Sequence, residues 1–93
     1  MPCAEIRAVA PDDSMSPVIH EGEEIFADPT ARLTPGCVAL VVHGGDVYVR
    51  RWARAGGNVT LSADAPGYSP VTFQEAGITV QFRVVRVRTC RAV

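Results

Sequence analysis

Short apolar runs separated by glycine, proline and polar residues dominate the chain. They lie at positions 25–27, 37–43, 47–52, 59–63, 71–73 and 78–87, and most are of strand rather than helix length. The only helical pattern is 16–22, where Ser16 can cap, Pro17 takes the first position and Gly22 ends the segment after about one turn. We therefore expect a mainly β fold of short, mostly antiparallel strands with at most one short helical turn, arranged in more than one packed sheet.

The best-defined local element is a hairpin around Gly44-Gly45, a dipeptide suited to a two-residue turn. Antiparallel counting from this turn sets His43 opposite Asp46 and Ala39 opposite Arg50. One face then carries the apolar positions 38, 40, 42, 47 and 49, and the other carries 37, 39, 41, 48 and 52 together with Arg50. Both faces should meet other structure, and Arg50 needs a partner because a buried charge is costly unless it is paired.

The last run changes phase along the strand. Apolar residues occupy even positions from Ile78 to Val84 and then odd positions at Val85 and Val87. Because side chains alternate between the two faces of a strand, such a switch requires one extra residue. We expect a β-bulge near Val84 and Val85.

Length and composition indicate one globular domain. The chain has 93 residues, of which 47% are hydrophobic and 20% charged, as in folded domains of this size. A formal net charge of −1 provides no global positive field for phosphate backbones. We therefore do not expect the chain itself to bind nucleic acid.

Cysteine usage and hydropathy limit the possible cofactors and the compartment. Cys3, Cys37 and Cys90 are widely spaced, with no CxxC pair and no histidine at metal-ligand spacing. The longest apolar run, 38–42, is far shorter than a membrane span, and the N-terminus lacks a basic-then-apolar signal pattern. We expect a reduced, cytoplasmic protein with no metal, no other cofactor and no membrane anchor.

A polar turn that contains serine and methionine introduces a family resemblance. The segment DSMSP at 13–17, followed by EGEEI at 21–25, resembles the signature of the LexA, UmuD and lambda-type repressor peptidases. The resemblance continues, in the family's order, through 25–29, 38–42, YVRR at 48–51, LSAD at 61–64, YSP at 68–70 and 84–87. It implies the β-fold shared by LexA and signal peptidase for residues 1–93, and it implies that Ser14 stands at the nucleophile position.

The chemistry of that family requires a residue that this chain lacks. A serine hydroxyl attacks a peptide carbonyl after a buried, neutral lysine takes its proton. Burial lowers the pKa of such a lysine from about 10.4 in water, so that part of the amine is uncharged at neutral pH. The matching position is Arg50, and a guanidinium donates hydrogen bonds and stays protonated in proteins, so it cannot be that base. The chain contains no lysine that could replace it.

The resemblance also suggests a partner for Arg50. Family geometry places Asp12, Asp13 and Ser14 nearest to it, so we expect one of them to pair with the guanidinium. The residues of the former active site would then stabilise the fold instead of catalysing cleavage. The alternative is that Arg50 extends past its aromatic neighbours on the strand to reach solvent.

Two histidines are candidates to replace the missing base. His20 follows Ser14 in the same turn, and His43 lies at the hairpin tip, several strand residues away from Arg50. Histidine exchanges protons near neutral pH, but neither position suits a base that must reach Ser14. We interpret both as surface polar residues.

The bond that the family cuts is absent ahead of Ser14. Relatives cleave themselves at an Ala-Gly or Cys-Gly bond before the catalytic domain, and no such pair occurs upstream of Ser14. Ala55-Gly56 and Ala76-Gly77 fall in predicted turns, and we interpret them as structural. We expect a single C-terminal peptidase-like domain without its N-terminal DNA-binding domain.

Three functions follow from these observations. The leading hypothesis is the regulatory and dimerisation domain of a LexA-like or phage-type transcriptional repressor, inactivated by Arg50, which forms a homodimer and contacts DNA only through a separate N-terminal domain. Phe82, Val84 and Val87 would supply either the dimer surface or plain core. The alternative is an active self-cleaving peptidase of the SOS response that uses Ser14 and responds to a recombinase filament. A signal-peptidase relative is the third hypothesis, which the lack of a membrane anchor disfavours.

Overall fold

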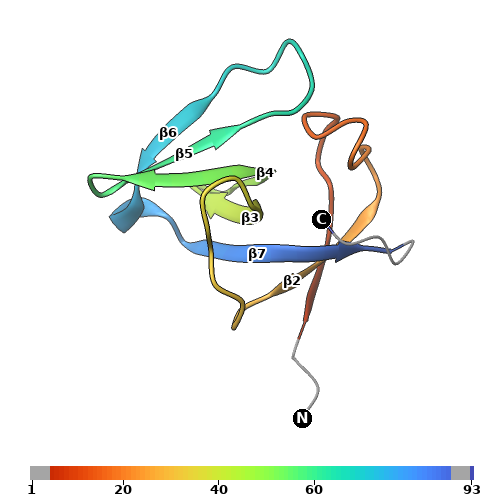
Figure 1. The fold of residues 1–93 in the computed structure, drawn as a ribbon, viewed down its shortest axis with the longest axis horizontal. Helices are drawn as coiled ribbons and strands as arrows, with labels where there is room; N and C mark the ends of the chain where they lie inside the picture. The colour runs from red at the N-terminus through yellow and green to blue at the C-terminus, as the bar shows by residue number, and fades with distance from the viewer. Residues whose placement is uncertain (1–4, 89–92) are drawn as a thin grey trace.

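In the computed structural model, which describes residues 5–88 and 93, seven strands form one antiparallel sheet (Figure 1). The elements are β1 (Ile6–Val9), β2 (Glu24–Asp28), β3 (Val38–His43), β4 (Asp46–Ala55), β5 (Asn58–Ser62), β6 (Val71–Gln74), the 3-10 turn η1 (Glu75–Gly77) and β7 (Val80–Val87). Their order across the sheet is β1-β2-β7-β3-β4-β5-β6. The prediction of a mainly β fold of short antiparallel strands is confirmed.

The expectation of more than one packed sheet is wrong, because a single sheet curls and packs side chains on both of its faces. β3 contributes to both clusters of buried residues, since its side chains alternate between the faces. One cluster contains Ala10, Met15, Ile19, Ile25, Ala27, Val38, Leu40, Val49, Val84 and Val87. The other contains Cys37, Ala39, Val41, Trp52, Val59 and Leu61.

The hairpin of β3 and β4 has the register that the sequence predicts. His43 pairs with Asp46 and Ala39 pairs with Arg50. Gly44 and Gly45 have φ values of 59° and 84°, so both central residues of the turn are in the left-handed region, which a type I′ turn requires. Both faces of the hairpin meet other structure, as expected.

The predicted bulge lies in β7, opposite β2. Ile25 pairs with Val87 and Ala27 pairs with Val84, so β7 has one more residue than β2 over this interval. The extra residue lets Val84 and Val87, which differ in parity, point into the same cluster. Both are fully buried, and β7 lies between β2 and β3. Val84 and Val87 are therefore core residues, and the prediction that they form a dimer surface is wrong.

The segment 16–22, predicted to be at most one turn of helix, forms turns with a single helix-like hydrogen bond from Ile19 N–H to the Met15 carbonyl at 3.0 Å. One strand differs from the sequence prediction. β1 was not predicted, because its short run is largely exposed and gives no clean alternation. Within the described residues, no helix is long and apolar enough to cross a membrane.

Candidate functional site

Ser14 lies in the segment that connects β1 to β2, and this segment is tied at both ends. The N–H of Ala10 donates to the carbonyl of Glu23 at 2.9 Å, and the N–H of Gly22 donates to the carbonyl of Ala10 at 3.0 Å. Met15, adjacent to the serine, is 1% exposed and anchors the segment in the core. Ser14 itself is 1% exposed, so its hydroxyl is held below the surface.

Asp12 and Asp13 use their carboxylates to hold the turn around Ser14. The N–H of Ser14 donates to Asp12 Oδ1 at 3.0 Å, and the N–H of Glu21 donates to Asp13 Oδ1 at 2.9 Å. The carbonyl of Ser14 accepts from the N–H of Ala65 at 2.9 Å. That last bond joins the turn to the loop between β5 and β6, which lies beside it in Figure 1.

Arg50 projects from β4 into the same region. It is 7% exposed, and its Nη2 lies 3.8 Å from Asp12 Oδ2 while its Nη1 donates to the carbonyl of Ser69 at 3.5 Å. Its guanidinium carbon is 5.4 Å from the ring centroid of Tyr48 and 5.5 Å from that of Tyr68. The prediction that Asp12, Asp13 or Ser14 pairs with Arg50 is confirmed, with Asp12 as the partner, and the alternative of a solvent-exposed side chain is wrong.

The two oxygens of Asp12 therefore connect Ser14 to Arg50. One accepts the backbone N–H of Ser14, and the other lies at ion-pair distance from Arg50. Within the described residues, Ser14 Oγ and Arg50 Nε are buried side-chain atoms without a hydrogen-bond partner. Asp12 thus joins the backbone of the serine to a charged donor, whereas activation of a hydroxyl requires an acceptor for its proton.

The loop over Arg50 is fixed by its neighbour on β4, through contacts that the sequence did not reveal. Arg51 donates from Nε and Nη2 to the two oxygens of Asp64, at 3.2 and 3.0 Å, and from Nη1 to the carbonyl of Gly36 at 3.2 Å. The hydrogen bond to Asp64 raises the pKa of Arg51 above its ordinary value. This bidentate pair holds the start of the loop that brings Tyr68 and Ser69 to Arg50.

The two histidines are placed differently from each other. His20 is exposed, with Nδ1 3.3 Å from Ser16 Oγ, as expected for a surface polar residue. His43 is half-buried and stacks on Phe73 with 4.0 Å between ring centroids and 14° between planes, so the surface interpretation is wrong for it. Its side chain packs instead against the β6 edge of the sheet.

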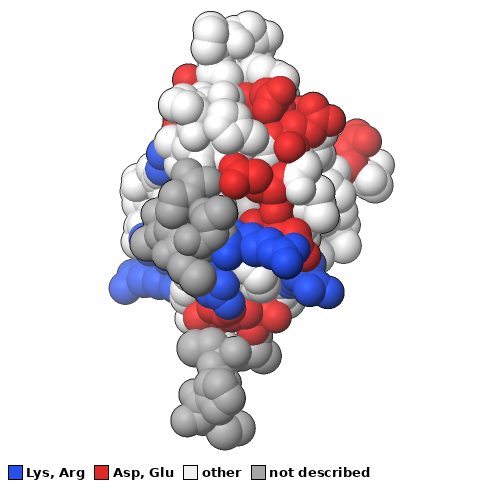
Figure 2. Space-filling model, turned by 90° about the vertical axis from the view of Figure 1, so that its right-hand side faces the viewer, with Lys and Arg blue, Asp and Glu red and all other residues white. Residues whose placement is uncertain are grey.

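Carboxylates are concentrated around the turn after β1. The segment 12–24 contains two aspartates and three glutamates and no Lys or Arg. Figure 2 shows Asp and Glu side chains gathered on this side of the molecule, above a band of Arg side chains. Among residues 5–88 and 93, no group of three or more His, Cys, Asp or Glu could hold a metal ion; Cys37 is buried, and Cys3 and Cys90 lie outside the described residues.

Comparison with known proteins identifies the family. No curated protein matches the chain. The sequence model of the Peptidase S24-like family matches residues 7–85, a span that includes both Ser14 and Arg50. Because this match covers most of the 93 residues, the chain belongs to the Peptidase S24-like family.

Proposed function

We propose that this chain is the C-terminal regulatory and dimerisation domain of a LexA-like or phage-type transcriptional repressor, with a peptidase site that Arg50 has inactivated. In this proposal Ser14 stands at the nucleophile position and Arg50 at the position of the general base. DNA is contacted only through a separate N-terminal domain, and the protein works in the cytoplasm.

The observation that carries the proposal is the environment of Arg50. A buried guanidinium 3.8 Å from Asp12, and 5.4 and 5.5 Å from the ring centroids of Tyr48 and Tyr68, supplies hydrogen-bond donors and positive charge at the position of the general base. It supplies no lone pair to take the serine proton, which a Ser–Lys peptidase requires. A domain of this family with such a site would regulate by assembly rather than by cutting itself.

Assembly into a homodimer requires a surface other than the core residues Val84 and Val87. The two edge strands of the sheet are β1 and β6. β6 exposes the polar residues Thr72 and Gln74, whereas β1 exposes Ile6 at 39% and Val9 at 54%. An edge strand with exposed apolar side chains is suited to pairing with another strand, so we assign the dimer contact to β1 and a second copy of this chain.

The charges at β1 are already paired inside each copy, Glu5 with Arg86 at 2.6 Å and Arg7 with Glu24 at 3.3 Å, so the assignment rests on the apolar side chains. An antiparallel pair of β1 strands centred on Ile6 sets Ile6 opposite its counterpart and Glu5 opposite Arg7 of the second copy. Side chains opposite each other across strands point to the same face, so the two-fold pair joins the two Ile6 side chains on one face and sets no like charges opposite each other on the other.

The experiment that tests the proposal is self-cleavage of the protein with a segment that contains an Ala-Gly bond added ahead of residue 1, because no such bond precedes Ser14. It is incubated at pH 7 and at about pH 10, where roughly a third of an ordinary lysine amine is neutral. Three versions are compared by mass spectrometry: the unmodified protein, Arg50→Lys, and Arg50→Lys with Ser14→Ala. We expect the unmodified protein to stay intact and Arg50→Lys to be cut at alkaline pH, dependent on Ser14.

The opposite result supports the competing function. Cleavage of the unmodified protein that Ser14→Ala abolishes would make it an active self-cleaving peptidase with a base other than lysine. In that case a recombinase filament should accelerate the cleavage, as expected for an SOS-type switch.

A further inference from the structure

Asp12 stands between the serine and the basic side chain, and its charge bears on the chemistry at position 50. We propose that Asp12 is a second determinant of the inactive site, whose carboxylate keeps any basic side chain at position 50 in its cationic form. The inference rests on the proposed function, because it concerns the same site. It adds that a lysine in place of Arg50 would remain largely protonated at neutral pH, so this substitution alone would restore only part of the peptidase activity.

The physical argument concerns which form of a lysine amine the site stabilises. A Ser–Lys peptidase needs the neutral amine, and burial favours that form because desolvation penalises charge. A carboxylate within about 4–6 Å has the opposite effect and favours the ammonium. A lysine ends about one bond short of the arginine Nη atoms, so the 3.8 Å between Arg50 Nη2 and Asp12 Oδ2 places its amine in that range.

The other groups that surround the position 50 side chain do not offset the carboxylate. From the loop between β5 and β6 come the Tyr68 ring and the carbonyl of Ser69, and from β4 itself comes Tyr48. A carbonyl oxygen and the faces of aromatic rings all favour a cation. The neighbouring cation, Arg51, is already held in a bidentate pair with Asp64.

The geometry provides a substitution that separates charge from structure. Asp12 Oδ1 accepts the N–H of Ser14, and an asparagine at this position keeps an oxygen for that bond while it removes the negative charge. Asp13 is the matched control, because it also accepts a backbone N–H, from Glu21, and no ion pair joins it to Arg50 in the described structure. Asp13→Asn therefore removes one charge from the same turn and leaves the contact with position 50 in place.

The first test measures the protonation of the introduced lysine directly. The chain has no lysine, so the Arg50→Lys variant contains a single one, and its ¹³Cε resonance can be titrated by NMR without overlap. We expect Asp12→Asn, combined with Arg50→Lys, to lower the lysine pKa by about 1–2 units relative to Arg50→Lys alone, and Asp13→Asn to change it much less. Equal shifts in the two double variants, or no shift in either, would overturn the role of Asp12.

The second test follows the pH profile of self-cleavage in the same double variants, each with the added Ala-Gly segment ahead of residue 1. A pKa lower by 1–2 units raises the neutral fraction about 10- to 100-fold at pH 7, and the rates should converge at alkaline pH. A change at every pH would instead indicate a merely structural role and contradict the proposal. Cleavage of the unmodified protein would contradict the proposed function, whereas the lysine titration would still decide the role of Asp12.

Discussion

The carboxylate of Asp12 and the guanidinium of Arg50 approach to 3.8 Å between Oδ2 and Nη2, and the two side chains are 36% and 9% exposed. This is ion-pair contact without a short hydrogen bond, in a place where the cation is buried and the anion partly solvated. Asp12 can be hydrated without its partner, whereas the charge of Arg50 has little access to water. The change in stability when Arg50 is replaced therefore depends mainly on whether the new side chain fills the volume that the arginine occupies.

We predict that Arg50→Ala and Arg50→Met have different effects on stability. Alanine leaves a cavity between the two tyrosine rings, and we expect the free energy of unfolding to fall by about 2–4 kcal/mol. Methionine fills most of the volume and removes the cost of burying a charge, so we expect a change within about 1 kcal/mol. Urea denaturation of both variants at pH 7 measures the difference, and an equal loss in the two would mean that the charge, not the packing, holds the site together.

The hairpin and the bulge could be predicted because each depends on local rules. A Gly-Gly turn fixes the register of β3 and β4, and the parity switch in 78–87 requires an extra residue. β1 could not be predicted, because an exposed edge strand has no buried face to impose alternation. The partners of Arg50 illustrate a second limit. The family resemblance narrowed one partner to Asp12, Asp13 or Ser14, but Tyr68 and Ser69 reach Arg50 through a loop whose course depends on tertiary contacts such as Arg51–Asp64.

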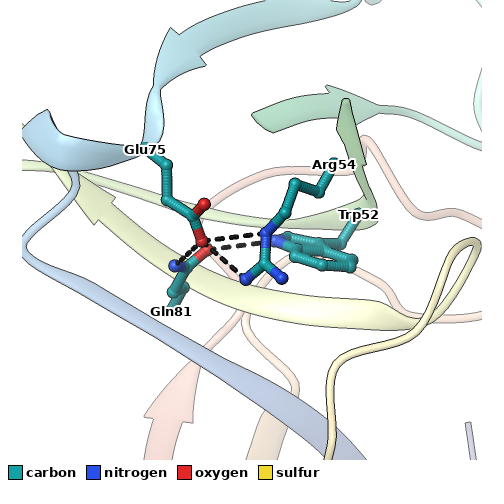
Figure 3. A network of polar contacts seen from close by, with 4 residues as sticks. All are labelled: Trp52, Arg54, Glu75 and Gln81. Carbon is teal, nitrogen blue, oxygen red and sulfur yellow. Dashed lines mark hydrogen bonds and ion pairs between the residues drawn. The ribbon is translucent and has the colours of Figure 1, made fainter. Parts of the chain in front are cut away.

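Trp52 is joined to β7 by a polar network that crosses the curled sheet (Figure 3). Its Nε1–H donates to Gln81 Oε1 at 3.1 Å, and Gln81 Nε2 donates to Glu75 Oε2 at 2.7 Å. The tryptophan is 2% exposed, so its N–H loses its partner within the protein if Gln81 is removed. We predict that Gln81→Ala destabilises the fold by about 1–3 kcal/mol, the usual cost of a buried donor left unsatisfied.

Trp52 is the only tryptophan, so its fluorescence reports the change directly. Unfolding in urea followed by this signal should give a lower midpoint for Gln81→Ala and an unchanged one for Gln74→Ala, an exposed glutamine on β6. Equal midpoints for Gln81→Ala and the unmodified protein would show that the indole N–H contributes nothing through this bond.

Glu75 should make stability depend on pH in the acidic range. Hydrogen bonds from Gln81 and from Arg54 lower the pKa of Glu75 below its ordinary value of 4.5. Because the folded-state pKa is the lower one, the contribution is fully present above the unfolded-state pKa and is lost as pH falls through the folded-state value. We predict that the stability difference between the unmodified protein and Glu75→Gln is constant near neutral pH and shrinks below 4.5.

Thermal unfolding from pH 7 to pH 3 measures this difference. Gln74→Ala, which changes an exposed residue without a titratable group, serves as the control, and its stability difference from the unmodified protein should not change with pH. A difference that grows on acidification would reverse the sign of the linkage and contradict the depressed pKa.

The edge strand β1 gives the last prediction, on assembly. Lysine on a strand edge prevents pairing because its charge must stay in water, so Ile6→Lys should shift the protein toward monomer in sedimentation velocity. Val47→Lys is the matched control, since Val47 on β4 is 42% exposed, close to the 39% of Ile6, but does not lie on an edge strand. We expect the sedimentation coefficient to fall for Ile6→Lys alone.

Two other outcomes would contradict this assignment. If both variants remain dimeric, β1 is not the contact and the second copy binds elsewhere. If only Val47→Lys dissociates, the dimer contact lies on the outer face of β4. Because Ile6 is exposed and outside both buried clusters, neither result can be attributed to loss of the fold.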